Sequence, residues 1–456
     1  MRNHLLPFCL LLVGCMPGAM PDQASRAAQP AAMSALPPIK TFSTPTPVRP
    51  GRSNIDIQRD FLELAFKLES GRELPVLTRF EQPITIRVTG TAPSTLMPDL
   101  TRLIYRLNTE AGLRVSLTRA PHANITVQAV TRAQIRKNLP HAACFVVPNI
   151  TDISQYRAAR RSSKANWGLL RKRETMAVFV PSDASPQEVR DCLHEELAQA
   201  IGPLNDLYRL PDSVFNDDNV HTVLTGFDML ILRAFYSPQL SNGMTRRQVA
   251  ARLPAILARL NPGGEQAASY RPAPTPRSWI RAIQTALGPG ATHSQRRIAA
   301  RNALQIAQSL GWQDHRRAFA HYAMGRLSAA TDPEAALGHF KTAERFYRAS
   351  PHTSLHQAYT ASQLAAHALT QGDGPGALSY VNGAIPVAAR YENAALLSTL
   401  MLLRAEALEL TGRASEAATV RLDSLGWARY GFGADWAVRA KLREIGALNP
   451  LKGKRG

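Results

Sequence analysis

Residues Leu193–Asp206 read LHEELAQAIGPLND, and this stretch carries the clearest structural signal in the chain. Apolar residues recur through it and just before it at helical spacing, at Val189, Leu193, Leu197 and Ile201. This spacing predicts an amphipathic helix. Ser185 followed by Pro186 is typical of a helix start, and Gly202-Pro203 is typical of a helix end. We therefore expect one helix between these two signals.

The same stretch resembles the long zinc-binding signature HExxHxxGxxH of the zincin metallopeptidases in one alignment frame. In that frame the metal-ligand positions hold oxygen-donor side chains, Glu195, Gln199 and Asn205. Glu196 falls on the general-base position and Gly202 on the turn glycine. The frame that starts at His194 fails, because Ala198 would stand four residues on, where a second ligand is required.

The exchanged side chains change the metal chemistry that the helix would support. Glu195 and Gln199 keep the i, i+4 spacing that brings two ligands to one ion, but oxygen replaces imidazole nitrogen. Oxygen donors suit Mg²⁺, Ca²⁺ or Mn²⁺ better than Zn²⁺. We expect zinc affinity far below that of a three-histidine site, with a divalent metal as the one cofactor to consider. Asp206 is the best additional oxygen ligand, although Asn205-Asp206 also fits a turn that ends the helix.

Two neighbouring side chains have alternative roles. Glu196 is the candidate catalytic residue, because it keeps the position of the base that activates water, and the alternative is an acid on the helix surface. His194 precedes the ligand frame, so we expect it on a neighbouring face of the helix with a structural role.

Downstream segments strengthen the resemblance. Ser213–Asn216 (SVFN) resembles the Met-turn of metzincins, with Phe215 as the apolar floor of the site, and residues 224–236 are similar to the last helix of matrixin-like peptidases. Together, EExxQxxGxxND, SxFND and LTxxD resemble the bacterial domain of unknown function family 2927, over roughly residues 80–250. This secreted, zincin-related family has no assigned activity. The resemblance implies a peptidase-like fold and no particular reaction.

The pattern over residues 53–260 fits that fold. Strand signals fall at residues 84–88, 114–117, 124–130, 144–147 and 175–180, and a helix signal at residues 93–111. The order is a strand, a helix, further strands and then the helix that carries Glu195. The predicted fold class is α+β, with a zincin-like N-terminal domain of mixed sheet plus active-site helix and an all-α C-terminal domain.

The second half of the chain has no strand signals. Residues 261–292 are rich in Pro and Gly and predict a linker with one short helix around Trp279–Leu287. In residues 293–449, Gly372 and Ala377 recur as Gly412 and Ala417, which indicates a repeat. The pattern resembles a tetratricopeptide-like array, and a generic helical bundle is the alternative. Residues 450–456 form a basic tail.

The N-terminus indicates export. Residues 1–15 form a short apolar signal that ends in Leu-Val-Gly-Cys, which resembles a lipobox with lipidation at Cys15. The alternative is an ordinary signal peptide with a chance cysteine. Residues 16–52 are expected to be a disordered tether. These features predict a protein that is lipid-anchored to the bacterial cell envelope and faces the periplasm.

The remaining cysteines agree with export. If residues 1–15 serve as signal and lipid site, Cys144 and Cys192 are left as a pair in an oxidising compartment. We expect a disulfide between them, and two buried thiols are the alternative.

The net charge of the chain is large, but it gives little information about the partners of the protein. The chain has 54 Lys and Arg against 34 Asp and Glu, a net charge of +20 over 456 residues. Such a balance favours anionic partners, but the basic residues are scattered, so a solvated surface is the better interpretation. An exported protein has no expected nucleic-acid partner.

Three functions follow from these features. The first is an envelope lipoprotein whose degenerate peptidase-like groove binds a peptide or polymer, with the helical repeats holding an envelope protein. The second is a divalent-metal-dependent hydrolase with an oxygen-rich site. The third is an assembly scaffold that acts through the helical repeats. The sequence ranks them in this order.

Overall fold

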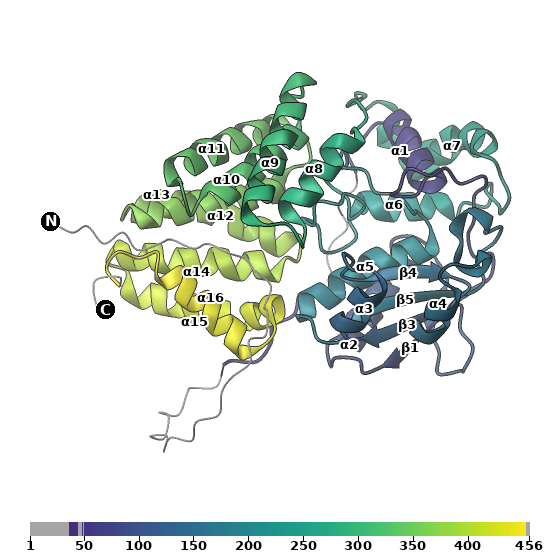
Figure 1. The fold of residues 1–456 in the computed structure, drawn as a ribbon, viewed down its shortest axis with the longest axis horizontal. Helices are drawn as coiled ribbons and strands as arrows, with labels where there is room; N and C mark the ends of the chain where they lie inside the picture. Colours follow the sequence, from purple (N-terminus) through teal and green to yellow (C-terminus); the bar gives the residue numbers. More distant parts are fainter. Residues whose placement is uncertain (1–35, 44–47, 49, 453–456) are drawn as a thin grey trace, which may run out of the picture.

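The computed structural model describes residues 36–43, 48 and 50–452. Figure 1 shows two regions side by side, a mixed region (residues 50–265) and a helical region (residues 277–452). This confirms the α+β class at the level of a mixed sheet followed by helices. The predicted signal with Cys15 lies outside the described residues, as does most of the basic tail. Within the described part of the chain, no helix has the length and apolar character needed to cross a membrane.

One sheet forms the centre of the mixed region. Its strands are β1 (Ile84–Gly90), β2 (Val115–Leu117), β3 (Ile125–Val130), β4 (Phe145–Pro148) and β5 (Met176–Pro181). Their order is β2-β1-β3-β5-β4, and only β4 runs antiparallel to its neighbour. Each of the strands predicted from the sequence is present, within one or two residues at either end, because buried apolar runs define them.

Helices cover both faces of this sheet. They are α1 (Asn54–Phe66), α2 (Leu96–Thr109), α3 (Arg132–Asn138), α4 (Ile153–Ala159), α5 (Pro186–Ile201), α6 (Gly226–Phe235) and α7 (Arg246–Leu260). Along β5, Val178 packs in the core shared with α2 and α5, whereas Phe179 packs in the core shared with α3 and α4. A strand buried on both faces in this way reads as a continuous apolar run.

Helix α5 is the helix expected from LHEELAQAIG and its flanking residues. The hydroxyl of Ser185 accepts a hydrogen bond from the backbone N–H of Glu188, and Pro186 is the first helical residue. The helix stops at Gly202, where the side chains of Leu232 and Phe235 on α6 leave little room for a larger residue. A disulfide between Cys144 and Cys192 joins the residue before β4 to the middle of α5. The predicted bridge is therefore confirmed.

The helical region is a series of antiparallel hairpins. Its helices are α8 (Arg277–Leu287), α9 (His293–Ser309), α10 (His315–Ser328), α11 (Pro333–Ala349), α12 (Ser354–Thr370), α13 (Gly374–Arg390), α14 (Ala394–Leu410), α15 (Ala414–Phe432) and α16 (Asp435–Gly446). Gly372 and Gly412 both adopt positive φ in equivalent turns of successive hairpins, which explains why glycine recurs there. Helix α8 falls in the predicted linker, but Trp279 and Ile283 pack in the first helical core. The helical region therefore begins earlier than residue 293.

Part of the predicted tether is packed against the fold. Residues 36–43 lie along α15, where the ring of Phe42 stacks on Trp427 with centroids 4.5 Å apart. The backbone N–H of Lys40 donates to the carbonyl of Gly426 at 3.1 Å. The composition of residues 16–52 predicts disorder, yet residues 36–43 differ from that prediction because one aromatic side chain supplies an anchor.

The two regions meet at the start of α5 (Figure 1). Arg190 is buried and its guanidinium donates to the carboxylate of Glu392 at 2.9 Å. Nearby, the hydroxyl of Tyr430 donates to the carboxylate of Asp99 at 2.7 Å. Buried polar groups are costly unless partnered, so these contacts fix one arrangement of the two regions.

We expect Arg190→Met to destabilise the junction by about 3–5 kcal/mol, because the carboxylate of Glu392 would be left buried without its cation. Denaturant unfolding of the full-length protein measures the loss. The double variant Arg190→Met with Glu392→Leu should recover a large part of it, since an apolar pair leaves no unpaired charge. Equal losses in the single and double variants would contradict a role for the ion pair.

Candidate functional site

The C-terminal half of α5 presents acidic and amide side chains toward the loops that follow α1 and α5. Glu196 and Gln199 are each 6% exposed, and Glu195 is half-buried. The buried guanidinium of Arg173 donates to the backbone carbonyls of Gln199 and Gly202. A cation at the C-terminal end of a helix is favourable, because it satisfies carbonyls that have no partner within the helix.

Further carboxyl groups meet this helix from loops. Glu69 follows α1 and interacts through its carboxyl with the side chains of Gln199 and Asp206. Charges on Asp191, Asp217 and Glu69 act on Glu195. We call this set the acidic cluster: Glu69, Asp191, Glu195, Glu196, Asp206 and Asp217.

Partial or full burial and mutual repulsion disfavour ionisation of the acidic cluster, whose one exposed member is Glu69. Burial is the first cause that raises the pKa of Glu195 and of Glu196 well above the usual value, and neighbouring carboxylates add to it. The pKa of Asp206 is raised for the same two reasons. Burial raises the pKa of Asp191 to about 7. Like charges that share a buried site cannot all ionise at neutral pH.

Two carboxyl oxygens of the acidic cluster are buried without a hydrogen-bond partner. They are Oε2 of Glu196 and Oδ1 of Asp206. Side-chain oxygens that are buried in native proteins are normally bonded, so each such exception calls for an explanation. A ligand that donates hydrogen bonds or carries positive charge would satisfy both oxygens.

The residues of the zinc-signature frame are only partly brought together. Glu195, Gln199 and Asp206 share the acidic cluster and its contacts. The amide nitrogen of Asn205, by contrast, donates to the backbone carbonyl of Glu63 on α1 at 3.1 Å. In the part of the chain that the structure describes, no group of three His, Cys, Asp or Glu is arranged to hold a metal ion.

His194 lies on a different face of α5 from the acidic cluster. Its Nδ1 accepts a hydrogen bond from the backbone N–H of Leu224 at 3.0 Å. Burial, together with the charges of Arg106 and Arg190, lowers the pKa of His194 well below its usual value. The imidazole is therefore neutral and connects α5 to the segment before α6.

The turn around Phe215 lies behind α5. The ring of Phe215 is fully buried in the core of the mixed region. The carboxyl of Asp228 accepts from the hydroxyl of Ser213 at 2.5 Å and from the backbone N–H of Val214 at 3.2 Å. These bonds hold the turn to α6, and the predicted role of Phe215 as the floor of a site stays a prediction.

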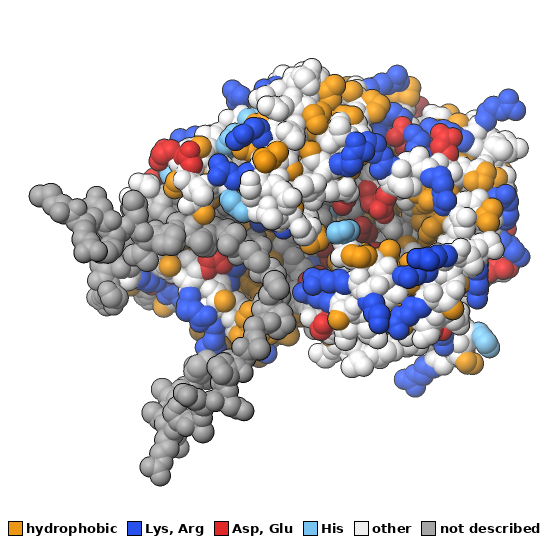
Figure 2. Space-filling view, viewed as in Figure 1, with side chains coloured by type: hydrophobic (Ala, Val, Ile, Leu, Met, Phe, Trp, Pro, Cys, Tyr) orange, Lys and Arg blue, Asp and Glu red, His pale blue; other side chains and the backbone are white. Residues whose placement is uncertain are grey.

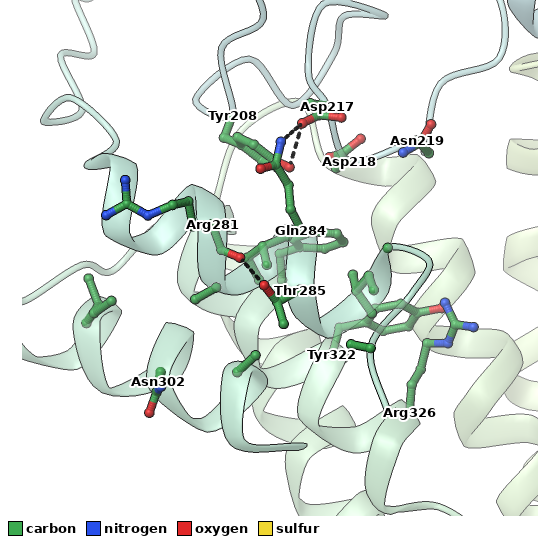
Figure 3. A pocket seen from close by; sticks show the side chains of 18 of the residues that line it. Tyr208, Asp217, Asp218, Asn219, Arg281, Gln284, Thr285, Asn302, Tyr322 and Arg326 are labelled. Carbon is green, nitrogen blue, oxygen red and sulfur yellow. Dashed lines mark hydrogen bonds between the residues drawn. The ribbon is translucent and has the colours of Figure 1, made fainter. Parts of the chain in front are cut away.

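A cavity of about 1510 Å³ is lined by one residue of the acidic cluster, Asp217. We call it the central cavity, and its walls come from the loop at residues 217–220 and from helices α8 to α12. Asp217 belongs to both features, and its carboxylate accepts from the hydroxyl of Tyr208 at 3.0 Å and from Gln284 at 3.1 Å (Figure 3). Figure 2 shows acidic side chains in a hollow between the two regions. The site is therefore a cleft with an acidic side.

Sequence reasoning did not identify Glu69, Asp191 or Asp217. Asp191 carried a usable signal, because it stands four residues before Glu195 and hence on the same face of the helix. Glu69 and Asp217 lie in loops, and contacts of α1 and α8 with the loop after α5 bring them to the cluster.

We expect Glu196→Gln to stabilise the protein, and to do so more at pH 8 than at pH 5. Folding raises the pKa of Glu196, so the wild-type carboxyl opposes folding increasingly as the pH rises above its unfolded value of about 4.3, whereas the amide does not titrate. The gain at pH 8 should be on the order of 1 kcal/mol, measured from denaturant unfolding curves.

The control is Glu174→Gln, which removes the same charge from a side chain that is 65% exposed. It should change stability equally at the two pH values. A loss of stability at pH 8 in Glu196→Gln would contradict the expectation and would indicate a bound cation that neutralises the wild-type carboxylate.

Comparison with known proteins gives one family. Residues 54–255 match the model of a family described as "Protein of unknown function (DUF2927)". A search of curated proteins and a search of solved structures each found no match. The matched span runs from α1 into α7, so it contains the whole sheet and all residues of the acidic cluster. The resemblance to family 2927 is thus confirmed for the mixed region.

Proposed function

We propose that the protein binds a peptide or an extended polymer in the cleft between its two regions, and does not cleave it. The observation that carries this proposal is the central cavity, which is lined by Asp217 of the acidic cluster. The same cluster holds the partnerless carboxyl oxygen of Glu196. A concave site with a few convergent polar groups is the usual form of a ligand pocket.

The fold of the mixed region supports a peptide ligand. The order β1, α2, then further strands with α3 and α4 between them, and finally the long helix α5 is compatible with the zincin-like fold that the sequence resemblance implies. A groove beside such a helix suits an extended chain. The hairpins of the helical region are compatible with a tetratricopeptide-like array, which would offer a second surface to an envelope protein.

The proposed location is the cell envelope. A lipid at Cys15 would hold the chain on a bacterial membrane, with the folded regions in the periplasm. The disulfide between Cys144 and Cys192 supports this location, because such bonds persist in oxidising compartments.

A second candidate function is hydrolysis assisted by a divalent metal. The raised pKa of Glu196 and its place in the zinc-signature frame favour it, since general bases and acids often have shifted pKa values. Glu195, Gln199 and Asp206 would have to rearrange to supply oxygen ligands, because no three His, Cys, Asp or Glu among the described residues are arranged to hold an ion. The metal would supply Lewis-acid chemistry. This function requires that Glu196→Gln abolish an activity that depends on added Mn²⁺, Mg²⁺ or Ca²⁺.

We expect Thr285→Trp to weaken peptide binding by at least about tenfold, because a large ring on this wall would project into the central cavity and obstruct it. Fluorescence anisotropy with a short, fluorescein-labelled peptide of lysine, leucine and alanine measures binding to the full-length protein. The assay contains a chelator in one arm and Mn²⁺ in the other. Mass spectrometry of the recovered peptide should show it intact in both arms.

The matched control is Thr101→Trp on α2. Both threonines are exposed helical residues whose hydroxyls donate to the carbonyl four residues earlier at 2.8 Å. Thr101→Trp should bind the peptide as the wild type does. Cleavage that depends on Mn²⁺ and on Glu196 would replace the binding proposal with the hydrolase, and equal binding by both tryptophan variants would remove the central cavity from the site.

A further inference from the structure

We propose that α10 and α11 form a binding site for a phosphate group, at a set of two arginines and two histidines that lies outside the central cavity. The set consists of Arg317 and His321 on α10 and of His339 and Arg345 on α11, and we call it the α10–α11 cluster. None of these four residues lines the central cavity. The inference therefore does not depend on the proposed peptide binding.

The ring of Phe346 on α11 brings these side chains together. The guanidinium carbons of Arg317 and Arg345 lie 4.7 and 5.1 Å from the centroid of this ring. The imidazole of His321 stacks on the same ring, with centroids 6.0 Å apart and an angle of 16° between the planes. His339 joins the group through its Nδ1, which lies 3.1 Å from Nδ1 of His321. A guanidinium that stacks on a ring keeps its N–H groups available to an anion.

No carboxylate neutralises the α10–α11 cluster. Within the described part of the chain, neither Arg317 nor Arg345 forms an ion pair. The nearby acids are bonded to other groups: Asp314 to Arg316, Glu344 to Arg348, and Asp332 to the backbone N–H of Ala335. Glu334 stands in the first turn of α11, about three turns from Arg345. The two positive charges are therefore left for a ligand.

Two nitrogen atoms of the α10–α11 cluster are buried without a hydrogen-bond partner. They are Nε2 of His321 and Nε of Arg317. His321 is 8% exposed, and buried polar atoms are normally bonded, so these exceptions call for an explanation. When His339 donates the hydrogen between the two Nδ1 atoms, the neutral ring of His321 carries its own hydrogen on Nε2. Both partnerless atoms are then donors that an anionic oxygen would satisfy.

A ligand can reach the cluster from the surface. Arg345 is exposed, and His339 and Arg317 are half-buried. Within the described residues, no hydrogen bond or ion pair restrains Arg345 beyond its contact with Phe346. The guanidinium of Arg345 is therefore free to turn, so that it can admit an anion and then bond with it.

The charges and donors of the cluster suit a phosphate more than a carboxylate. A phosphate monoester carries about −1.5 to −2 charges at pH 7 and three acceptor oxygens. Arg317 and Arg345 match it with two full charges, and guanidinium groups bond to phosphate through paired N–H donors. Burial, with the charges of His339, Arg317 and Arg345, lowers the pKa of His321 to about 4. At pH 7 this imidazole is therefore neutral and contributes a hydrogen bond.

Calorimetric titration of the full-length protein tests the site, at a constant ionic strength set with sodium chloride. The probes are inorganic phosphate, the monoester glycerol 3-phosphate, the diester glycerophosphoglycerol and acetate. The diester has the chemistry of a phospholipid headgroup, and acetate represents a carboxylate. Inorganic phosphate and the monoester should bind at least about tenfold more tightly than the other two, because only they carry nearly two charges.

Variants assign the binding to the cluster. Arg345→Gln should weaken phosphate binding about tenfold, because it removes a charge-assisted hydrogen bond. Arg317→Gln is the second variant and should have an effect of similar size. The matched control is Arg348→Gln, which removes the same charge from the same helix at a side chain that is 69% exposed. This control should bind phosphate as the wild type does.

The imidazole signals give a readout that a merely structural cluster would not change. Among the described residues, the charges that act on the two imidazoles are those of Arg317, Arg345 and Asp332, besides the imidazoles themselves. Sulfate keeps its charge over the range of the titration. It should raise the pKa of His321, measured by NMR, above its value in sodium chloride of equal ionic strength, because a bound anion favours the protonated ring. Arg345→Gln should reduce this rise.

Several outcomes would overturn the proposal. The site is absent if neither phosphate probe binds, and it lies elsewhere if both arginine variants bind phosphate as the wild type does. If acetate binds as tightly as phosphate, the cluster is a carboxylate site, and tighter binding of the diester would assign it to a lipid headgroup. If Zn²⁺ shifts the two imidazole signals while phosphate and sulfate do not, the facing Nδ1 atoms are metal ligands instead.

Discussion

The acidic cluster depends on the fixation of α5. Its carboxyl groups repel one another, so the helix would move away from the loops that carry Glu69 and Asp217 if it were free. Three attachments prevent this: the ion pair of Arg190 near its start, the disulfide at Cys192 and the bonds from Arg173 at its end. Each attachment uses a group that belongs to a different part of the chain. The three attachments thereby hold together carboxyl groups that repel one another. Such local strain, supported by contacts elsewhere, is common at functional sites.

In the absence of a ligand, protonation of the carboxyl groups is the simplest way to reduce the repulsion within the acidic cluster. A carboxyl whose pKa is raised on folding remains neutral at higher pH than in the unfolded chain, so the acidic cluster favours the folded state less as the pH rises. Buried histidines at the junction act in the opposite direction. Burial lowers the pKa of His221 and of His315 to about 4. These two side chains therefore make the folded state less stable as the pH falls below about 6.5, where they become protonated in the unfolded chain. A cationic ligand would compete with protons for the cluster and would bind more tightly at higher pH.

The features that were predicted correctly from the sequence are those that local sequence patterns determine. The ends of α5 follow from Ser185 and Gly202, the strands follow from apolar runs, and the disulfide follows from the pairing of two remaining cysteines. What was not predicted depends on contacts distant in sequence. The composition of residues 36–43 predicts disorder, and the contact of Phe42 with the distant residue Trp427, which orders them, is not visible in the local sequence. The sequence of α8 resembles a linker, and only the packing of its apolar face against α9 shows that it belongs to the helical region. Asn205 has the position of a metal ligand in the sequence, but in the structure its amide is bonded to α1.

The cleft exists only while the mixed region and the helical region remain joined. The central cavity takes walls from the loop that follows α5 and from five helices of the helical region, so neither region contains it alone. The same junction holds Phe42, whose ring lies over the guanidinium of Arg190 at 5.4 Å while stacking on Trp427. The segment leading from the N-terminus, the helical region and α5 therefore meet at one point. The buried pair of Arg190 and Glu392 therefore also helps to keep the walls of the central cavity in one arrangement.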